Sequence, residues 1–177
     1  TNTVTVEHGG REYEVDTGFI VFNERTYPNF IHLLDELGVD WQDSDMGFSV
    51  QHEKTGLEYS GSTINSLFAQ RRNIFRPSFH RMIREILRFN REAPSLLENS
   101  ANRISLRDYL AKENYSREFI DNFIIPMGAA IWSAKPEVMG TMPAEFFIRF
   151  FQNHGMISVN DRPVWRVIKG GSNRYVE

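Results

Sequence analysis

The 177-residue sequence contains no cysteine. A disulfide framework, a thiolate nucleophile and a cysteine-ligated metal ion are therefore excluded. Histidine, another common metal ligand, occurs at positions 8, 32, 52, 80 and 154, which are too scattered to match a metal-binding motif. We expect no metal site in this chain.

Three signatures of cofactor and nucleophile chemistry are also missing. The chain has no G-x-G-x-x-G dinucleotide loop, no phosphate-binding P-loop and no G-x-S-x-G nucleophile elbow. No acidic, basic or nucleophilic side chain stands out as a general acid or base. The sequence therefore identifies no catalytic residue.

Long apolar runs and an excess of positive charge are absent as well. The longest apolar run, Phe123–Trp132, is too short to span a bilayer and contains Pro126. The formal net charge of −3 argues against a dedicated nucleic-acid binder. We expect a cytoplasmic protein, with peripheral contact at the inner face of the membrane left open.

Phenylalanine, by contrast, is abundant, with 14 residues. Phenylalanine rings fill a core, and they also line cavities that take flat or apolar ligands. At this length the chain can form one domain with a substantial core, or one domain with a helical appendage.

Alternating polar and apolar residues predict strands near both ends of the chain. The turn at His8–Gly10 predicts a β-hairpin, and the residues 53–56 predict a second one. A further strand precedes Gly170 and Gly171. The predicted strands are Val4–Glu7, Arg11–Asp16, Asp45–Gln51, Gly56–Tyr59 and Val164–Ile168.

Between these ends, apolar side chains recur at helical spacing. Thr26 is expected to cap a helix that has Pro28 in its first turn and ends at Gly38. The other predicted helices are Ser78–Glu92, one that starts at Ser105, one that runs from Ser116 until Pro126 interrupts it, and Thr141–Asn153.

These elements predict an α+β fold, with antiparallel hairpins or a small sheet from both ends of the chain and a helical middle. The chain divides into a strand-rich segment at 1–61, a helical segment at 62–156, and a returning strand with a Gly-Gly turn at 157–177.

A basic stretch lies at the start of the helical segment. Seven arginines between positions 71 and 92 face only two acidic residues, Glu85 and Glu92, and seven minus two gives a local charge of +5. Four of the arginines, Arg81, Arg84, Arg88 and Arg91, recur on one helix face. This face either contacts anionic lipid or an acidic ligand, or is a solvated face neutralised by acidic residues elsewhere.

Two glycine-containing stretches are candidates for a ligand site. In the stretch 15–22, Gly18 allows either a flat ring such as a flavin or another backbone segment to approach closely. The stretch 127–133 combines small residues with Trp132 and fits either a pocket wall or a tight contact between helices. Trp165 and the Gly170–Gly171 turn leave the same two alternatives open.

Several of these segments together resemble one family. The stretch Asp16–Pro28 resembles a signature of bacterial FAD-dependent oxidoreductases in the flavin-containing amine oxidase superfamily. The segments 67–72, 126–133, 147–151 and 165–177 are similar to the same family, in the same order along the chain.

The resemblance implies a flavoenzyme in which hydride passes from a substrate carbon to the flavin. In such proteins a Rossmann unit with a glycine-rich loop lies upstream and binds the pyrophosphate of FAD. The resemblance therefore implies that this chain is an internal fragment, the substrate-binding portion, inactive by itself.

The resemblance also assigns residues to the two ligands. The residues expected at the flavin are Thr1, Asn2, Thr17, Gly18, Phe19, Ile20, Trp165, Gly170 and Gly171. Those expected to line the substrate cavity are Phe48, Met127, Gly128 and Trp132. The substrate is a small molecule, either an amine or a lipid-like compound, and the sequence specifies neither the electron acceptor nor the oligomeric state.

A second hypothesis does not involve an enzyme. The arginine face between Arg81 and Arg91, together with the phenylalanine-rich helices, is typical of a module that binds lipid or another protein. The two hypotheses are compatible if the enzyme acts on a membrane-derived substrate.

Overall fold

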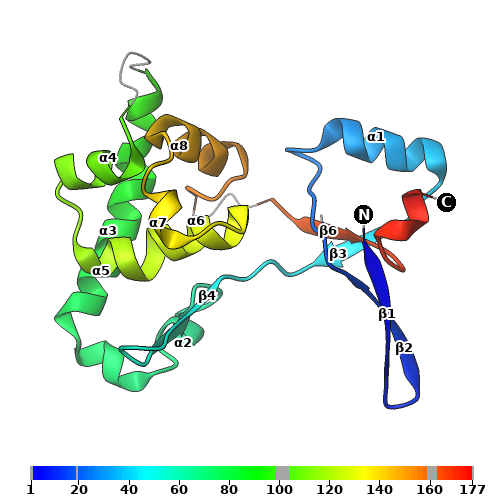
Figure 1. Cartoon of the computed structure of the whole chain (residues 1–177), viewed down its shortest axis with the longest axis horizontal. Coiled ribbons are helices and arrows are strands. Elements are labelled where there is room, and N and C mark those ends of the chain that lie inside the picture. Colours follow the sequence, from blue (N-terminus) through cyan, green and yellow to red (C-terminus); the bar gives the residue numbers. More distant parts are fainter. Residues whose placement is uncertain (1, 19, 99–103, 159–162, 177) are drawn as a thin grey trace. The chain divides into compact units, whose positions relative to one another are not determined.

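The computed structural model describes residues 2–18, 20–98, 104–158 and 163–176 (Figure 1). The chain divides into two units. Unit 1 comprises Thr1–Met46 and Asp161–Glu177, and unit 2 comprises Gly47–Asn160. Unit 1 is therefore built from both ends of the sequence, and unit 2 is inserted between them. Helices and small antiparallel sheets occur as predicted, which confirms the α+β class.

The described residues of unit 1 form two antiparallel strand pairs, one α-helix and a short 3₁₀ helix. β1 (Thr3–His8) and β2 (Arg11–Asp16) form the predicted hairpin, and Gly9 and Gly10 make its turn with φ of 60° and 72°. Positive φ at both positions is typical of the two-residue turn that matches the twist of a hairpin. β3 (Trp41–Ser44) pairs with β6 (Trp165–Ile168), and α1 (Pro28–Leu37) ends at Gly38.

Aromatic rings form the core of unit 1. Phe22, Leu34 and Ile168 are buried there. The ring of Phe22 lies edge-on to Phe30 at 5.1 Å, and Phe30 in turn contacts Tyr175 at 5.3 Å. Tyr175 belongs to the short 3₁₀ helix η4 (Ser172–Tyr175), so the last turn of the chain covers the same core as α1. Such edge-to-face pairs are favourable beyond the area they bury.

Unit 2 is helical apart from one hairpin. β4 (Ser49–His52) and β5 (Leu57–Ser60) pair through the predicted turn, and the helices follow them along the chain (Figure 1). In order these are α2 (Ile64–Leu67), η1 (Arg71–Phe75), α3 (Pro77–Glu92), η2 (Ala93–Glu98), α4 (Leu106–Lys112), α5 (Arg117–Phe119), the π-helical turn η3 (Ile120–Ile124), α6 (Ile125–Trp132), α7 (Pro136–Met139) and α8 (Ala144–Asn153).

Phenylalanine side chains fill the interior of unit 2. Phe89, Phe119, Phe147 and Phe151 are buried in its main core, and the rings of Phe147 and Phe151 stack at 4.3 Å. A second cluster gathers around the β4–β5 hairpin and α3 and contains Val50, Leu57, Tyr59, Phe79 and Met82. The buried phenylalanine rings of unit 2 therefore fill its core, which is the first of the two roles considered for phenylalanine.

The predicted break at Pro126 is wrong. The helix continues from η3 into α6, and Pro126 lies in the first turn of α6. A proline has no amide hydrogen, so Pro126 donates no hydrogen bond to the preceding turn of the helix. The hydroxyl of Tyr59 donates to the Asn122 carbonyl in that turn at 2.7 Å. A tertiary contact thus supplies a hydrogen-bond donor at the point where the proline supplies none.

Two predicted helix starts are also shifted. Tyr27, rather than Thr26, occupies the cap position of α1, and the amide of Thr26 donates to the side chain of Asn23 at 2.8 Å. α8 begins at Ala144 rather than Thr141, because a residue that precedes a proline, here Met142 before Pro143, is disfavoured in a helix.

We expect Tyr59→Phe to lower the free energy of unfolding of unit 2 by about 1–2 kcal/mol, since it leaves the Asn122 carbonyl without its hydroxyl donor. The matched control is Tyr13→Phe, because the Tyr13 side chain is exposed on β2. Urea unfolding followed by circular dichroism measures both variants. Equal effects of the two substitutions would contradict a special role for the Tyr59 hydroxyl.

Candidate functional site

Two distant parts of the chain meet in unit 1 at the carboxylate of Asp16. The hydroxyl of Thr3 donates to Asp16 Oδ1 at 2.6 Å. The backbone amide of Ser172 donates to the same oxygen at 2.9 Å, and the Ser172 hydroxyl donates to Asp16 Oδ2 at 2.8 Å. The amide of Asn173 completes the set by donating to Thr3 Oγ1 at 3.2 Å. We name these four residues the Asp16 network.

These hydrogen bonds determine the charge state of Asp16. Burial raises the pKa of the Asp16 carboxyl, but the hydrogen bonds from Thr3 and Ser172 outweigh it and hold the pKa below its ordinary value. The carboxylate is therefore ionised at neutral pH, where it can accept all of its donors at once.

The Gly170–Gly171 turn packs directly on the hairpin beside this network. Gly171 is buried with φ of 90°, and a Cβ atom placed on it would lie 2.8 Å from Thr3 Cγ2. Only glycine fits there, because both the backbone angle and the space exclude a side chain. The absence of a side chain at Gly171 thus leaves space for the Thr3 methyl group. The expected role of Gly171 at the flavin stays a prediction.

Four more of the residues expected at the flavin belong to the described part of the chain, and three of them, Asn2, Thr17 and Gly18, gather at the open end of the hairpin. The Asn2 side-chain amide donates to Thr17 Oγ1 at 2.6 Å, and the Thr17 amide donates to the Asn2 carbonyl at 2.9 Å. At Gly18 a Cβ atom would find its nearest neighbour, the Asn2 amide nitrogen, at 3.9 Å, so the position is open. Ile20 is exposed.

Trp165 and Gly170 are the other described residues of that set. Trp165 pairs with Ser44 at the start of β6, while Gly170 follows the end of that strand. The rest of β6 and the start of the following turn separate the two positions along the chain. Thr1 and Phe19 lie outside the described residues.

The exposed groups around Gly18 suit a flat polar ring. Gly18 presents backbone without a side chain, Asn2 and Thr17 provide amide and hydroxyl groups, and Ile20 provides an apolar contact. The expected role of this set at a flavin ring stays a prediction. The set contains no glycine-rich loop for a pyrophosphate.

In unit 2, Gly128 makes a tight contact between helices. A Cβ atom at this position would lie 2.8 Å from Met139 Cε and 2.9 Å from Phe147 Cε2. Trp132, one turn further along α6, packs its ring against Phe150 at 4.7 Å and against Phe147 at 5.5 Å. These contacts favour the tight helix contact over the pocket wall for Gly128.

Met127 and Phe48, the other residues expected at the substrate, belong to different clusters. Met127 is partly buried against the main core of unit 2. Phe48 packs against the second cluster and meets the ring of Phe123 edge-on at 6.1 Å. Phe123 and Ile86 pack against both clusters and connect them.

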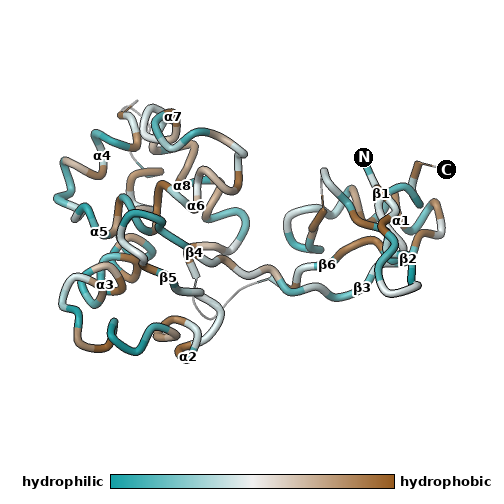
Figure 2. Tube along the Cα trace, turned by 60° about the horizontal axis from the view of Figure 1, so that its bottom comes forward, coloured by the Kyte–Doolittle hydropathy of each residue, from teal (hydrophilic) through white to brown (hydrophobic). Residues whose placement is uncertain are grey.

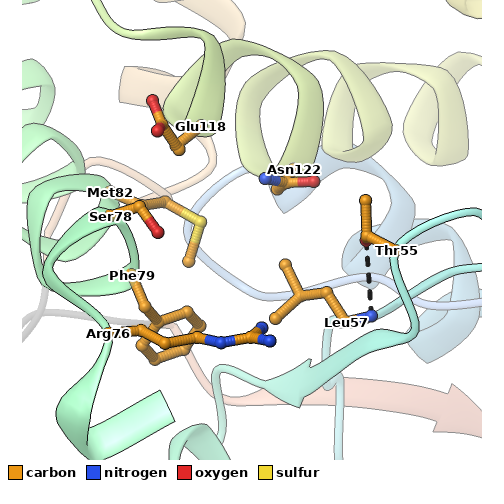
Figure 3. A pocket seen from close by; sticks show the side chains of 8 residues that line it. All are labelled: Thr55, Leu57, Arg76, Ser78, Phe79, Met82, Glu118 and Asn122. Carbon is orange, nitrogen blue, oxygen red and sulfur yellow. Dashed lines mark hydrogen bonds between the residues drawn. The ribbon is translucent and has the colours of Figure 1, made fainter.

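A pocket of about 210 Å³ lies in unit 2 (Figure 3). Its apolar floor comes from Leu57, Phe79 and Met82, and its polar groups include a cationic side chain, Arg76, and an acidic one, Glu118. Thr55, Ser78 and Asn122 complete the lining. This arrangement can hold a small molecule that carries both polar and apolar groups. Sequence reasoning missed this pocket, because its lining comes from three separate segments that share no motif.

The predicted arginine face of α3 is divided by the structure. The Arg88 guanidinium lies 3.9 Å from the centre of the Tyr115 ring and donates to the carbonyl of Glu113 at 2.8 Å. The Glu85 carboxylate is engaged within unit 2, where it accepts hydrogen bonds from the amide and hydroxyl of Ser116, the cap of α5. Arg81 and Arg84 are exposed.

Two searches of the described residues found nothing. Within the described ranges, no group of three or more histidine, aspartate or glutamate side chains is placed to hold a metal ion. Among the helices in those ranges, none is both long and apolar enough to cross a bilayer.

The Asp16 network predicts a specific pH dependence. A carboxyl whose pKa is lowered in the folded state contributes stability above its unfolded pKa of about 3.9, and the contribution is lost as the pH falls through the folded value. We expect unit 1 to lose stability below about pH 4. We expect Asp16→Asn to lower its free energy of unfolding at neutral pH by about 1–3 kcal/mol and to flatten the acid dependence.

The fluorescence of Trp41 and Trp165, both in unit 1, measures this unfolding between pH 3 and 7 in a Trp132→Phe background. The control is Asp35→Asn, an exposed aspartate on α1. If Asp16→Asn and the control had the same acid profile, the assigned role of Asp16 would be wrong.

The contact at Gly128 can be tested by adding one methyl group. Helix propensity alone would make Gly128→Ala stabilising by about 1 kcal/mol. Because the new Cβ would meet Met139 and Phe147, we expect a loss of about 1–3 kcal/mol instead, measured by urea unfolding. Ala130→Val, which enlarges an exposed residue of the same helix, is the control and should change stability little. Stabilisation by Gly128→Ala would show that the contact is loose.

Searches of protein-family models and of curated proteins found no match to this chain. The contacts within the two units therefore have to support the functional argument by themselves.

Proposed function

We propose that this chain is the substrate-binding portion of an FAD-dependent oxidoreductase, with unit 1 at the flavin edge and unit 2 on the substrate side. The observation that supports this proposal is the Asp16 network. It joins Asp16 to Ser172, 156 positions later in the chain, and thereby holds the Gly170–Gly171 turn against the hairpin that ends in Asn2, Thr17 and Gly18.

The resemblance to flavin-containing amine oxidases implies this same grouping, since it assigns residues from both ends of the sequence to one cofactor. The division of the chain gives independent support. Unit 1 comprises both ends, while unit 2 is a continuous insertion that contains Phe48, Met127, Gly128 and Trp132. This division agrees with the assignment of flavin residues to both ends of the sequence and of substrate residues to its middle.

When bound, FAD supplies the hydride acceptor, and the residues of this chain bind and orient. Asn2 and Thr17 offer hydrogen-bonding groups to the polar rim of the ring, and Gly18 allows the backbone to approach its face. Asp16 keeps these residues in place through Thr3 and Ser172 rather than by touching the ring itself. No residue of the chain is assigned a proton-transfer step.

Flavin binding by this chain alone is expected to be weak. The pyrophosphate of FAD is usually held by a glycine-rich loop at the start of a helix, and the sequence has no such loop. The proposal therefore includes a dinucleotide-binding unit elsewhere in the natural protein. It places the enzyme in the cytoplasm, with a small-molecule substrate that is an amine or lipid-like.

The test uses the natural protein that contains this chain and measures its flavin absorbance after purification. We expect Gly18→Leu to weaken flavin binding at least tenfold, about 1.4 kcal/mol, without loss of stability, because Gly18 is exposed and a Cβ atom there makes only an ordinary van der Waals contact.

Gly61→Leu is the matched control. Gly61 is likewise exposed, and its nearest neighbour to a Cβ atom, the Phe48 carbonyl oxygen, is also 3.9 Å away, but it belongs to unit 2. A natural protein that contains no FAD and cannot be reconstituted with it would overturn the proposal. Equal flavin content in the two glycine variants would remove Gly18 from the site.

A further inference from the structure

Unit 2 exposes large apolar side chains beside arginines. The Phe75 side chain is 85% exposed and that of Ile64 is 80% exposed, values far above those of the core. Both lie in the segment that contains α2, η1 and α3, in which apolar stretches alternate with hydrophilic ones (Figure 2). We define the Phe75 patch as Ile64, Ile74, Phe75, Arg71, Arg81 and Arg84.

Hydrogen bonds and ring contacts connect the elements that carry this patch. The Arg71 guanidinium donates to Asn65 Oδ1 at 2.7 Å, which joins η1 to α2. His80 contacts the carbonyl of Ile74 at 2.8 Å, and its ring lies 5.8 Å from that of Phe68. The end of α2 and the Ile74–Phe75 turn therefore both lie against the His80 side of α3.

That side of α3 continues as a basic stripe. His80, Arg84, Leu87 and Arg91 are exposed and follow one another at helical spacing, with Arg81 beside them. Between positions 63 and 91 the only acidic residue is Glu85, and its carboxylate is bound to Ser116. In the described part of the chain, neither Arg81 nor Arg84 forms an ion pair.

We propose that the Phe75 patch docks unit 2 on an anionic lipid bilayer. The arginines match the phosphates of acidic headgroups, with which a guanidinium forms paired hydrogen bonds. Phe75 and Ile64 are single protruding side chains on short helical turns. A bilayer accepts such side chains at the boundary between headgroups and acyl chains.

A lipid surface fits these observations better than a protein partner does. Arginine and aromatic residues are also enriched at protein–protein interfaces, so the residue types alone do not separate the two partners. The arrangement favours lipid, because single apolar side chains stand between arginines along the sequence, as the boundary between headgroups and acyl chains requires. The proposal does not depend on the flavin chemistry proposed above, since it concerns residues of unit 2 alone and is measured without any cofactor.

The first experiment measures binding of the 177-residue chain to phosphatidylcholine vesicles with and without phosphatidylglycerol. We expect binding only when phosphatidylglycerol is present, and a loss of roughly 30-fold in affinity in the double variant Arg81→Glu, Arg84→Glu. The control Lys112→Glu, Lys135→Glu makes the same change in charge at exposed positions elsewhere in unit 2 and should bind like the parent chain. Circular dichroism melts verify that all variants are folded.

The second experiment uses the absence of cysteine, which allows one dye to be attached at a chosen position. Phe75→Cys carrying an environment-sensitive dye should show a blue shift on anionic vesicles. Val138→Cys should not, because Val138, 57% exposed, lies on α7 outside the patch.

Several results would overturn the proposal. These are absence of vesicle binding, equal binding to neutral vesicles, and equal loss of affinity in the two double variants. Arginine-dependent binding without a blue shift at position 75 would also overturn it, since this result would indicate contact with an acidic surface without insertion.

Discussion

The carboxylate of Asp16 holds together two stretches of chain that are 156 positions apart, and the organisation of unit 1 depends on it. A single ionised group accepts hydrogen bonds from the hairpin through Thr3 and from the last turn of the chain through Ser172. The same contact brings Gly171 against Thr3, where any side chain would clash. Closing the chain at this point allows the whole of unit 2 to be an insertion.

In unit 2 a side-chain hydroxyl likewise joins two elements that are distant in the sequence. Pro126 removes one amide hydrogen from the helix that it enters, and the Tyr59 hydroxyl from the β5 strand donates to the carbonyl of Asn122. Gly128 then allows Met139 and Phe147 to approach the backbone, so that Trp132 can pack on α8. The stretch after Pro126 is therefore best explained by packing between helices, and the substrate function assigned to it remains a proposal.

Local patterns predicted the elements whose partners are close in sequence. The two glycines after His8 and the alternating residues around them are sufficient for the first hairpin, and Ser105 and Ser116 cap their helices as expected. The β3–β6 pairing was not predicted, because Trp41–Ser44 is short, mostly polar and paired with residues more than 120 positions away. The pocket around Arg76 and Glu118 was not predicted for the same reason. The residues that line it are far apart in the sequence and do not recur at a regular spacing.

The arginine-rich helix shows why charge counted along a sequence and charge presented to solvent differ. The count gave Arg88 and Glu85 equal and opposite weight, but the fold uses both internally, Arg88 over the Tyr115 ring and Glu85 at the cap of α5. These internal contacts leave the net count unchanged and change its distribution. Arg81 and Arg84 face solvent. Phe75, in the preceding η1, is 85% exposed. The lipid surface proposed above accounts for the exposed Phe75 of η1 together with these arginines, whereas a solvated face accounts for the arginines alone.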